Sequence, residues 1–517
     1  MAVFGRLKWD TLAYGTALAV DRIAGFLLLP ILTAAWRPEI FAAWSQILVA
    51  YAFLSNILLV GFYHSVVRFI HGIERDLVGK IFHGMLGVIL LNCAVFLVGV
   101  TFCRPYLSAA LFASRSLESI VLPGSFYVVS EAIFEFVLLG FMRADGKIVA
   151  CSVYYALKNV VRLATLGALA TYGIATALTA LVAVNVGLSA MAYVLHIAPS
   201  FEYSSNRLEA GFWPRLFGYS LPIVASGNVS WANAFVNRFL LVHFLGLADL
   251  AVYALNYSVA SIVHVAAMCV NFLLVPRVNA AWNAGDTVQV CRLLKMATEY
   301  YLFGAVPLAV AIGVLYPQLL AILAPTSYGG GPVLMAMLIA FMVLLGLEQI
   351  LLFATLIKNS YFGLGVRVAA LIVNVVLNVL LIRQQGLVGS VFAGNVALGV
   401  TILLSIWYLQ KAVAGYAFPW RAVGELVVAG AVMLGGGLLV AGWLPAAAIP
   451  ALLLGGTVCG LLFLGAESLR AHSIVRMLVG LVRERKHAPG GAGNPQDAPL
   501  IPRVTGESPN ETLFPRQ

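Results

Sequence analysis

Charged side chains are scarce in this sequence. Only 10% of its 517 residues are Asp, Glu, Lys or Arg, and 62% are hydrophobic, whereas soluble domains carry roughly a quarter charged residues. The mean hydropathy is +0.97. This deficit excludes an ordinary soluble protein, and repeated apolar segments of about 20 residues predict transmembrane helices. The sequence therefore predicts an all-α, polytopic membrane protein.

Cysteine pairs and catalytic motifs are also missing. The six cysteines are scattered through apolar segments, and the sequence has no CxxC or Cys/His spacing typical of a zinc site or a disulfide framework. It also lacks the Walker A, HExxH and GxSxG sequences. We therefore expect no metal, no cofactor, no ATP hydrolysis and no enzymatic activity in this chain.

The formal net charge of +10 reflects topology rather than nucleic-acid binding. Most Lys and Arg residues fall in loops on one side of the predicted spans, as the positive-inside rule requires. That side is assigned to the cytoplasm, and both termini are predicted to lie there. Among loop residues, the outer side receives Arg37, Arg104, Arg115 and Arg383.

The apolar segments predict about fourteen spans, with an amphipathic and then disordered cytoplasmic tail over 471–517. Spans 1–6 would form an N-terminal lobe (1–200), spans 7–12 a C-terminal lobe (201–415), and spans 13 and 14 an addition (416–470). The predicted spans are 11–36, 40–67, 81–103, 119–142, 148–172, 174–197, 216–246, 250–275, 297–323, 332–357, 361–383, 387–410, 421–443 and 445–468.

An internal repeat supports the two lobes. The pair Asp21-Arg22 aligns with Asn237-Arg238, Glu135 with Glu348, and the turn-like segment at Pro105 with the one at Pro317, at offsets of 212 to 216 residues. Six spans per copy bring both copies in from the same side, so the repeat is parallel. Two such lobes around a polar interior are typical of a transporter that works by rocking of one lobe against the other.

Eight charged residues are predicted to lie inside the membrane. Each costs about 2.5–3.5 kcal/mol at mid-bilayer, so they must be paired or face a hydrated space. Their charges sum to zero. These residues are Asp21, Arg22, Glu131, Glu135, Lys158, Arg162, Arg238 and Glu348.

Four of them form two facing pairs. Glu131 and Glu135 on one span, and Lys158 and Arg162 on the next, are each spaced i, i+4 and so share a helix face. Counting from the cytoplasmic ends places Glu135 level with Lys158 and Glu131 level with Arg162. One interpretation is a static ion-pair ladder. The other is a carboxylate that exchanges a proton while the released cation binds an anionic substrate.

Arg22 and Arg238 lie at repeat-equivalent positions of the two lobes. If they face each other across a cavity, their planar, bidentate guanidinium groups would suit a diphosphate. The alternative is structural pairing with Asp21 or Glu348. Among weaker signals, Asn374 and Asn378 predict interhelical hydrogen bonds. His64, His243 and His264 are candidate proton relays that are more simply explained as hydrogen-bonded side chains.

Several segments together resemble the polysaccharide biosynthesis exporters of the MOP superfamily, the Wzx-type flippases. The opening TLAYGTALAVDRIAGFLLLPILTAAWRPEIFAAWSQ (11–46) resembles the first helix and loop of that family, although Ala42 replaces the usual glycine. Asn237 stands where the family usually has Asp, which weakens any ion-coupling role there. The other matching segments are GFYHSVVRF (61–69), FMRADGK (141–147), YSLP (219–222), NRFLL (237–241) and QGLVG (385–389).

The resemblance implies a flippase that carries an undecaprenyl-diphosphate-linked oligosaccharide, such as an exopolysaccharide or O-antigen repeat unit, across a bacterial inner membrane by alternating access. It implies coupling to H⁺ or Na⁺, contact with membrane lipids and possible assembly with a polysaccharide polymerase. We expect Arg22, Arg238, Lys158 and Arg162 to bind the substrate, and Asp21, Glu131, Glu135 and Glu348 to be the coupling candidates. Alternatives are a lipid II flippase and a multidrug or metabolite exporter of the same superfamily.

Overall fold

The computed structural model describes residues 2–63, 75–201, 211–441 and 448–468. Within these ranges the chain is helical and has no β-strand. The main helices are α1 (Ala2–Ala35), α2 (Pro38–Leu58), α4 (Arg75–Phe112), α5 (Glu118–Ala132), α6 (Leu139–Ala144), α7 (Ile148–Leu169), α8 (Ile174–Ala192), α9 (Phe212–Leu245), α10 (Leu247–Ala260), α11 (Val265–Asn283), α12 (Thr287–Val314), α13 (Tyr316–Leu323), α14 (Gly331–Lys358), α15 (Ser360–Ala412), α16 (Trp420–Ala441) and α17 (Ala448–Ser468).

The described helices confirm a multi-pass membrane protein. Ten of them are long and apolar enough to cross a bilayer, and each of the fourteen predicted spans overlaps a helix. Helix α15 covers two of those spans in 53 residues, and it bends at Gly386 (φ 59°, ψ −135°), a conformation open essentially to glycine alone. The count of fourteen membrane crossings stays a prediction.

Two expected boundaries differ from the structure. The segment at Pro105 is not a turn, because α4 continues through it to Phe112, and membrane helices tolerate internal prolines. The second predicted span (40–67) is interrupted at 59–61, and its last residues, 64–67, lie outside the described residues. Helix α2 stops at Leu58, and Gly61 follows with φ 70°. A Cβ on Gly61 would come within 2.8 Å of Ser220 and Val224 on α9, so the close approach of α9 requires glycine there.

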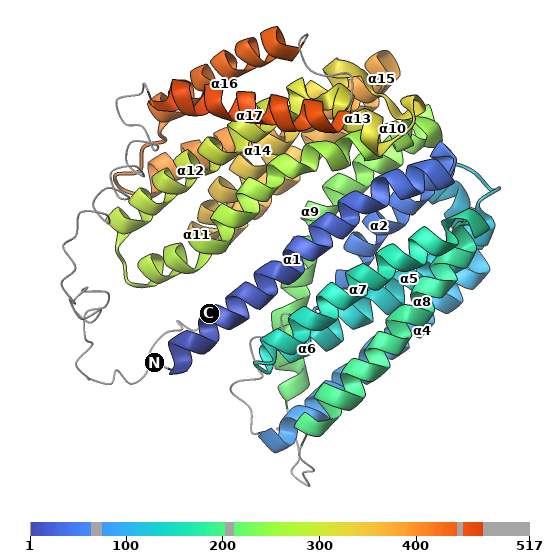
Figure 1. Cartoon of the computed structure of the whole chain (residues 1–517). Coiled ribbons are helices and arrows are strands. Elements are labelled where there is room, and N and C mark those ends of the chain that lie inside the picture. Colours follow the sequence, from blue (N-terminus) through green and yellow to red (C-terminus); the bar gives the residue numbers. More distant parts are fainter. Residues whose placement is uncertain (1, 64–74, 202–210, 442–447, 469–517) are drawn as a thin grey trace, which may run out of the picture. The chain divides into compact units, whose positions relative to one another are not determined.

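The chain from α1 to α8 and the chain from α9 to α15 pack in the same way (Figure 1). Helix α1 packs on α7 in the first set, and α9 packs on α15 in the second. Likewise α4 packs on α5, and α12 on α14. We refer to these sets as the N-terminal half (2–200) and the C-terminal half (212–412). They meet through α2, which packs against α9 and α10.

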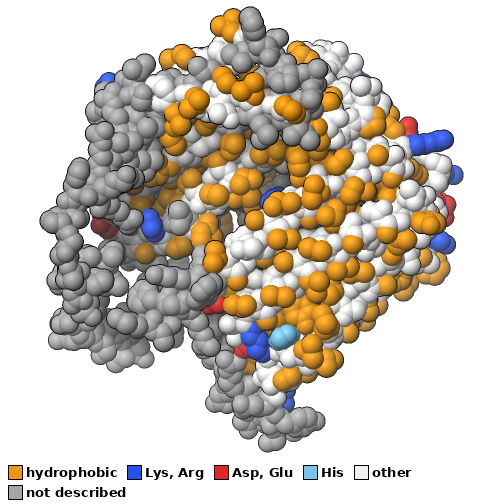
Figure 2. All heavy atoms as spheres, in the orientation of Figure 1, with side chains coloured by type: hydrophobic (Ala, Val, Ile, Leu, Met, Phe, Trp, Pro, Cys, Tyr) orange, Lys and Arg blue, Asp and Glu red, His pale blue; other side chains and the backbone are white. Residues whose placement is uncertain are grey.

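Residues 1–463 form one compact unit, and 464–517 form a second unit of which only the end of α17 is described. Helix α16 packs on α12 of the first unit. The predicted domain limits at 200 and 415 stay predictions, and the predicted amphipathic tail lies outside the described residues. Figure 2 shows a mostly apolar face, with basic and acidic atoms toward its edges and basic atoms in a recess near its middle. Such a surface suits a lipid environment.

Candidate functional site

A widened helical turn places two carboxylates beside α7. Helix α5 ends at Ala132 and continues as a π-helical segment, η2 (Ile133–Leu138), before α6 begins. Such segments are rare and are found frequently at functional sites. Glu131 precedes this segment and Glu135 lies in it, so the irregular turn sets the positions of both side chains.

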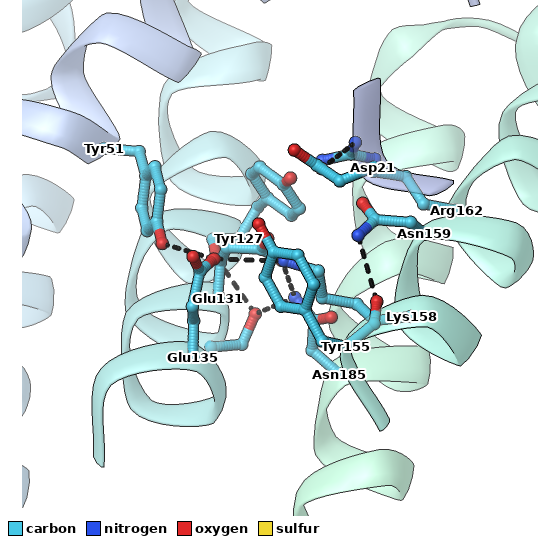
Figure 3. A network of polar contacts seen from close by, with 11 residues as sticks. Asp21, Tyr51, Tyr127, Glu131, Glu135, Tyr155, Lys158, Asn159, Arg162 and Asn185 are labelled. Atoms are coloured by element: carbon cyan, nitrogen blue, oxygen red, sulfur yellow. Dashed lines mark hydrogen bonds and ion pairs between the residues drawn. The ribbon is translucent and has the colours of Figure 1, made fainter. Parts of the chain in front are cut away.

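Lys158 of α7 joins these two carboxylates. Its Nζ donates to Glu131 Oε1 at 2.7 Å and to Glu135 Oε2 at 3.0 Å (Figure 3). Asn185 of α8 donates to the second oxygen of Glu131 at 2.8 Å. Tyr51 of α2 donates to Glu135 Oε2 at 2.9 Å. Five helical segments, α2, α5, η2, α7 and α8, therefore contribute to this group of one lysine and its two acids.

Arg162 pairs with a residue that the sequence did not indicate. It was expected level with Glu131, which lies close enough to interact with it electrostatically, and its guanidinium also donates to Asp21 Oδ1 of α1 at 3.4 Å. The close packing of α1 on α7 brings Asp21 to Arg162. Adjacent spans can be matched by counting residues, but this contact joins the first and fifth predicted spans, which share no sequence signal.

We call the group Asp21, Glu131, Glu135, Lys158 and Arg162 the acidic cluster. Its centre is closed and its edges are accessible: the side chains of Lys158 and Glu131 are 3% and 4% exposed, whereas those of Glu135 and Asp21 are 25% and 20% exposed. With every group ionised, three carboxylates face two cations. The cluster then carries one excess negative charge, and Glu135 is its most accessible acid.

Arg22 lies outside the acidic cluster. Its side chain is exposed, and its guanidinium donates to the sulfur of Met268 on α11, 3.4 Å away in the C-terminal half. A thioether is a weak acceptor. Among the described residues Arg22 forms no ion pair, and neither Asp21 nor Glu348 pairs with it.

Arg238 is held differently. It is half-buried on α9 and donates to the Oγ and backbone oxygen of Ser45 on α2, at 3.2 and 3.4 Å. Its guanidinium also lies over the rings of Tyr253 and Tyr257, 5.8 and 5.5 Å from their centroids. No carboxylate of the described chain pairs with it. The structure does not bring Arg238 and Arg22 into contact with each other.

Amides occupy the corresponding interior of the C-terminal half. Asn237 accepts hydrogen bonds from Asn374 at 3.1 Å and Asn378 at 2.8 Å. Ser390 donates to Asn378 Oδ1 at 2.7 Å. All four side chains are buried. The predicted interhelical bonding of Asn374 and Asn378 is confirmed, and we call this group the amide cluster.

Glu348 and two of the three histidines lie apart from both clusters. Glu348 is half-buried and forms no hydrogen bond or ion pair with any other described residue; Arg367 is its charged neighbour. His243 donates to the carbonyl of Phe239 in its own helix at 2.9 Å, and His264 approaches Gln349. His64 lies outside the described residues. No group of three His, Cys, Asp or Glu residues could hold a metal ion in the described chain.

Several further contacts join the two halves at the end of the molecule where α1 ends and α2 begins. Thr33 Oγ1 donates to the carbonyl of Leu323 at 2.8 Å. Tyr328 donates to the carbonyl of Trp36 at 3.4 Å, and its ring packs edge-on against Phe41. The predicted topology assigns this end to the outer side of the membrane.

The fold of this chain is similar to that of several solved membrane transporters. A structure described as the lipid II flippase MurJ in an inward closed conformation matches with a TM-score of 0.73 at 13% identity, covering 90% of this chain and all of that one. An inward-facing multidrug resistance transporter of the MATE family matches at 0.61 and 16% identity, covering 78% of this chain and 99% of that one.

A third solved structure, the MATE multidrug transporter DinF-BH in complex with R6G, matches at 0.58 and 16% identity, covering 79% of this chain and 96% of that one. No protein-family model and no curated protein matches the sequence. At these identities the likeness establishes the fold, and the substrate must be argued from the side chains.

Proposed function

We propose that this chain is a transporter rather than an enzyme, and that it flips an undecaprenyl-diphosphate-linked oligosaccharide, such as an exopolysaccharide or O-antigen repeat unit, across a bacterial inner membrane. The observation that carries this proposal is a division among the four intramembrane cations. Lys158 and Arg162 are neutralised by carboxylates, whereas Arg22 and Arg238 have no carboxylate partner among the described residues.

The two arginines suit a diphosphate. One belongs to each half, and guanidinium groups bind phosphate oxygens through paired N–H donors. A guanidinium without a counter-ion is costly inside a membrane, and a phosphate that replaces the Met268 sulfur at Arg22 would offset this cost. Lys158 and Arg162 would contribute to substrate binding only after release from their acids.

The acidic cluster is the proposed coupling element. Its one excess negative charge favours uptake of one H⁺ or Na⁺, and Glu135 is the acid most open to exchange. Alternating access would then require the contacts at Thr33, Trp36 and Ser45 to break, so that the outer end opens. Membrane lipids and polysaccharide-assembly proteins, including a polymerase, are the proposed partners.

A second candidate is flipping of lipid II, which the TM-score of 0.73 with the MurJ structure favours. Both substrates would use the same diphosphate chemistry, so the arginines alone do not separate them. A multidrug exporter is a weaker candidate, because a site built from two cationic arginines repels the cationic compounds and offers nothing to the apolar compounds that such proteins expel.

Complementation separates these candidates. The wild-type chain is expressed in strains that lack an oligosaccharide flippase and each make a different glycan, and in a strain depleted of its lipid II flippase. We expect rescue of at least one glycan strain, and loss of rescue in Arg22→Ala and Arg238→Ala at normal membrane abundance. Arg421→Ala is the control, because that guanidinium is 85% exposed and pairs locally with Glu425.

Rescue of the lipid II strain alone would assign the second candidate. Full activity of both arginine variants would contradict the diphosphate site.

A further inference from the structure

A polar stripe on the C-terminal half faces Arg22. His264, Met268 and Asn271 are spaced i, i+4 and i+7 along the continuous helical path that joins η6 (Ser261–His264) to α11, so they share one face. Met268 at the centre contacts the Arg22 guanidinium. The stripe therefore lies across the interface from Arg22.

Gln349 of α14 ties the two polar ends of the stripe together. Its Nε2 lies 3.4 Å from His264 Nε2, and its Oε1 accepts from Asn271 Nδ2 at 3.2 Å. Because an amide nitrogen only donates, His264 Nε2 is the acceptor, and the proton of the neutral ring is on Nδ1.

Two polar atoms of the stripe lack partners. His264 Nδ1 and Asn271 Oδ1 are buried and form no hydrogen bond with any part of the chain that the structure describes. One is a donor and the other an acceptor. Leaving such atoms unsatisfied costs about 1–3 kcal/mol each. A ligand that provides both an acceptor and a donor would remove this cost, and a sugar hydroxyl or acetamido group provides both.

We infer that the stripe His264–Met268–Asn271, with Gln349, is a sugar subsite that binds the hydroxyl or acetamido groups of the residue attached directly to the diphosphate held by Arg22. Seven residues of helix span about 10 Å, which is enough for one sugar ring beside its phosphate. Met268 is 41% exposed and its thioether bonds weakly, so a phosphate displaces it from Arg22. This inference rests on the proposed function and adds which chemical groups of the substrate the C-terminal half binds.

Binding of two lipids tests the subsite. The purified full chain in nanodiscs is titrated with undecaprenyl diphosphate, and separately with undecaprenyl-diphosphate N-acetylglucosamine. We expect Arg22→Ala to weaken the binding of both lipids by a similar factor of about ten or more, because each complex loses a charge-assisted contact to phosphate. Asn271→Leu and Gln349→Leu should weaken the binding of the sugar-bearing lipid about fivefold per lost hydrogen bond. The affinity for undecaprenyl diphosphate without the sugar should change by less than twofold.

His264→Phe keeps the ring volume and should behave like Asn271→Leu. His243→Phe is the matched control, since the hydrogen bond described for that imidazole is to its own helix. Thermal unfolding of each variant verifies folding, and Asn271→Ser gives a second, smaller change at the same position. The sugar subsite alone would be overturned if the stripe variants weakened the binding of both lipids equally, or if they were folded and weakened the binding of neither. Failure of the wild-type chain to bind either lipid would overturn the proposed function and the subsite with it.

Discussion

The two halves of the molecule join the same pair of helices through different kinds of side chain. In the N-terminal half, Asp21 of α1 pairs with Arg162 of α7. In the C-terminal half, Asn237 of α9 bonds Asn374 of α15. These positions correspond through the repeat, at offsets of 216 and 212 residues. The same helix pair is therefore joined by an ion pair in one half and by amides in the other.

This difference bears on the proposed site of ion coupling. Replacement of a buried ion pair by neutral groups is often neutral or stabilising, and the amide cluster shows that neutral groups suffice at this helix pair. Stability alone therefore does not explain the charges in the acidic cluster. The proposed charge exchange would explain them, and at these positions the described charges lie in the N-terminal half.

Removal of the central cation should have the largest effect. Lys158→Met leaves Glu131 buried without its counter-ion, and breaking a buried pair in this way costs about 3–5 kcal/mol. We expect a strong loss of folded protein, measured as thermal stability in detergent and as abundance in the membrane. The variant Lys158→Met with Glu131→Gln is the control and should recover most of the loss. A single variant as stable as wild type would show that Lys158 does not hold the cluster together.

Replacement of the Asp21–Arg162 ion pair by amides, as found in the C-terminal half, should have an intermediate effect on stability. Asp21→Asn removes the carboxylate that forms an ion pair with Arg162, whose side chain is 15% exposed, and we expect a loss of about 1–3 kcal/mol. Asp21→Asn with Arg162→Asn reproduces the amide pair and should restore stability. Thermal unfolding of the two single variants and the double variant measures this coupling. Additive losses would mean that the two halves are not interchangeable here.

The sequence predicted the helices and much of the acidic cluster for identifiable reasons. Uninterrupted apolar segments fix the spans, and the i, i+4 spacing of Glu131 with Glu135 placed both acids on the face toward Lys158. The contact of Asp21 with Arg162 was not predictable, because it depends on α1 packing against α7 across 141 residues.

The polar stripe was also missed. His264 appeared in the sequence only as an isolated residue, and Asn271 and Gln349 become neighbours only when α11 packs against α14.

The two halves also share a backbone feature that should respond equally to mutation. Gly173 before α8 has φ 99°, and Gly386 within α15 has φ 59°, at an offset of 213 residues. A Cβ would meet no atom within 4 Å at either position, so the cost of Ala is backbone strain of about 1–3 kcal/mol. We expect similar losses of thermal stability in Gly173→Ala and Gly386→Ala. Gly187→Ala inside α8 is the control and should be neutral or stabilising; unequal losses would argue against equivalent turns.

Neutralisation of Glu135 or of Glu348 should change stability least, but the two variants should differ most clearly in transport. Glu135 and Glu348 correspond at an offset of 213 residues, but Glu135 bonds Lys158 and Tyr51, whereas Glu348 has no such partner in the described chain. Either change to Gln should cost less than about 1 kcal/mol, because Lys158 keeps Glu131 in the first case and no pair is lost in the second. Transport in proteoliposomes, measured with and without imposed pH and sodium gradients, should lose its gradient dependence in Glu135→Gln and keep it in Glu348→Gln, since only Glu135 belongs to a cluster with an excess charge to neutralise. The reverse result would place coupling in the C-terminal half and make the acidic cluster a static support.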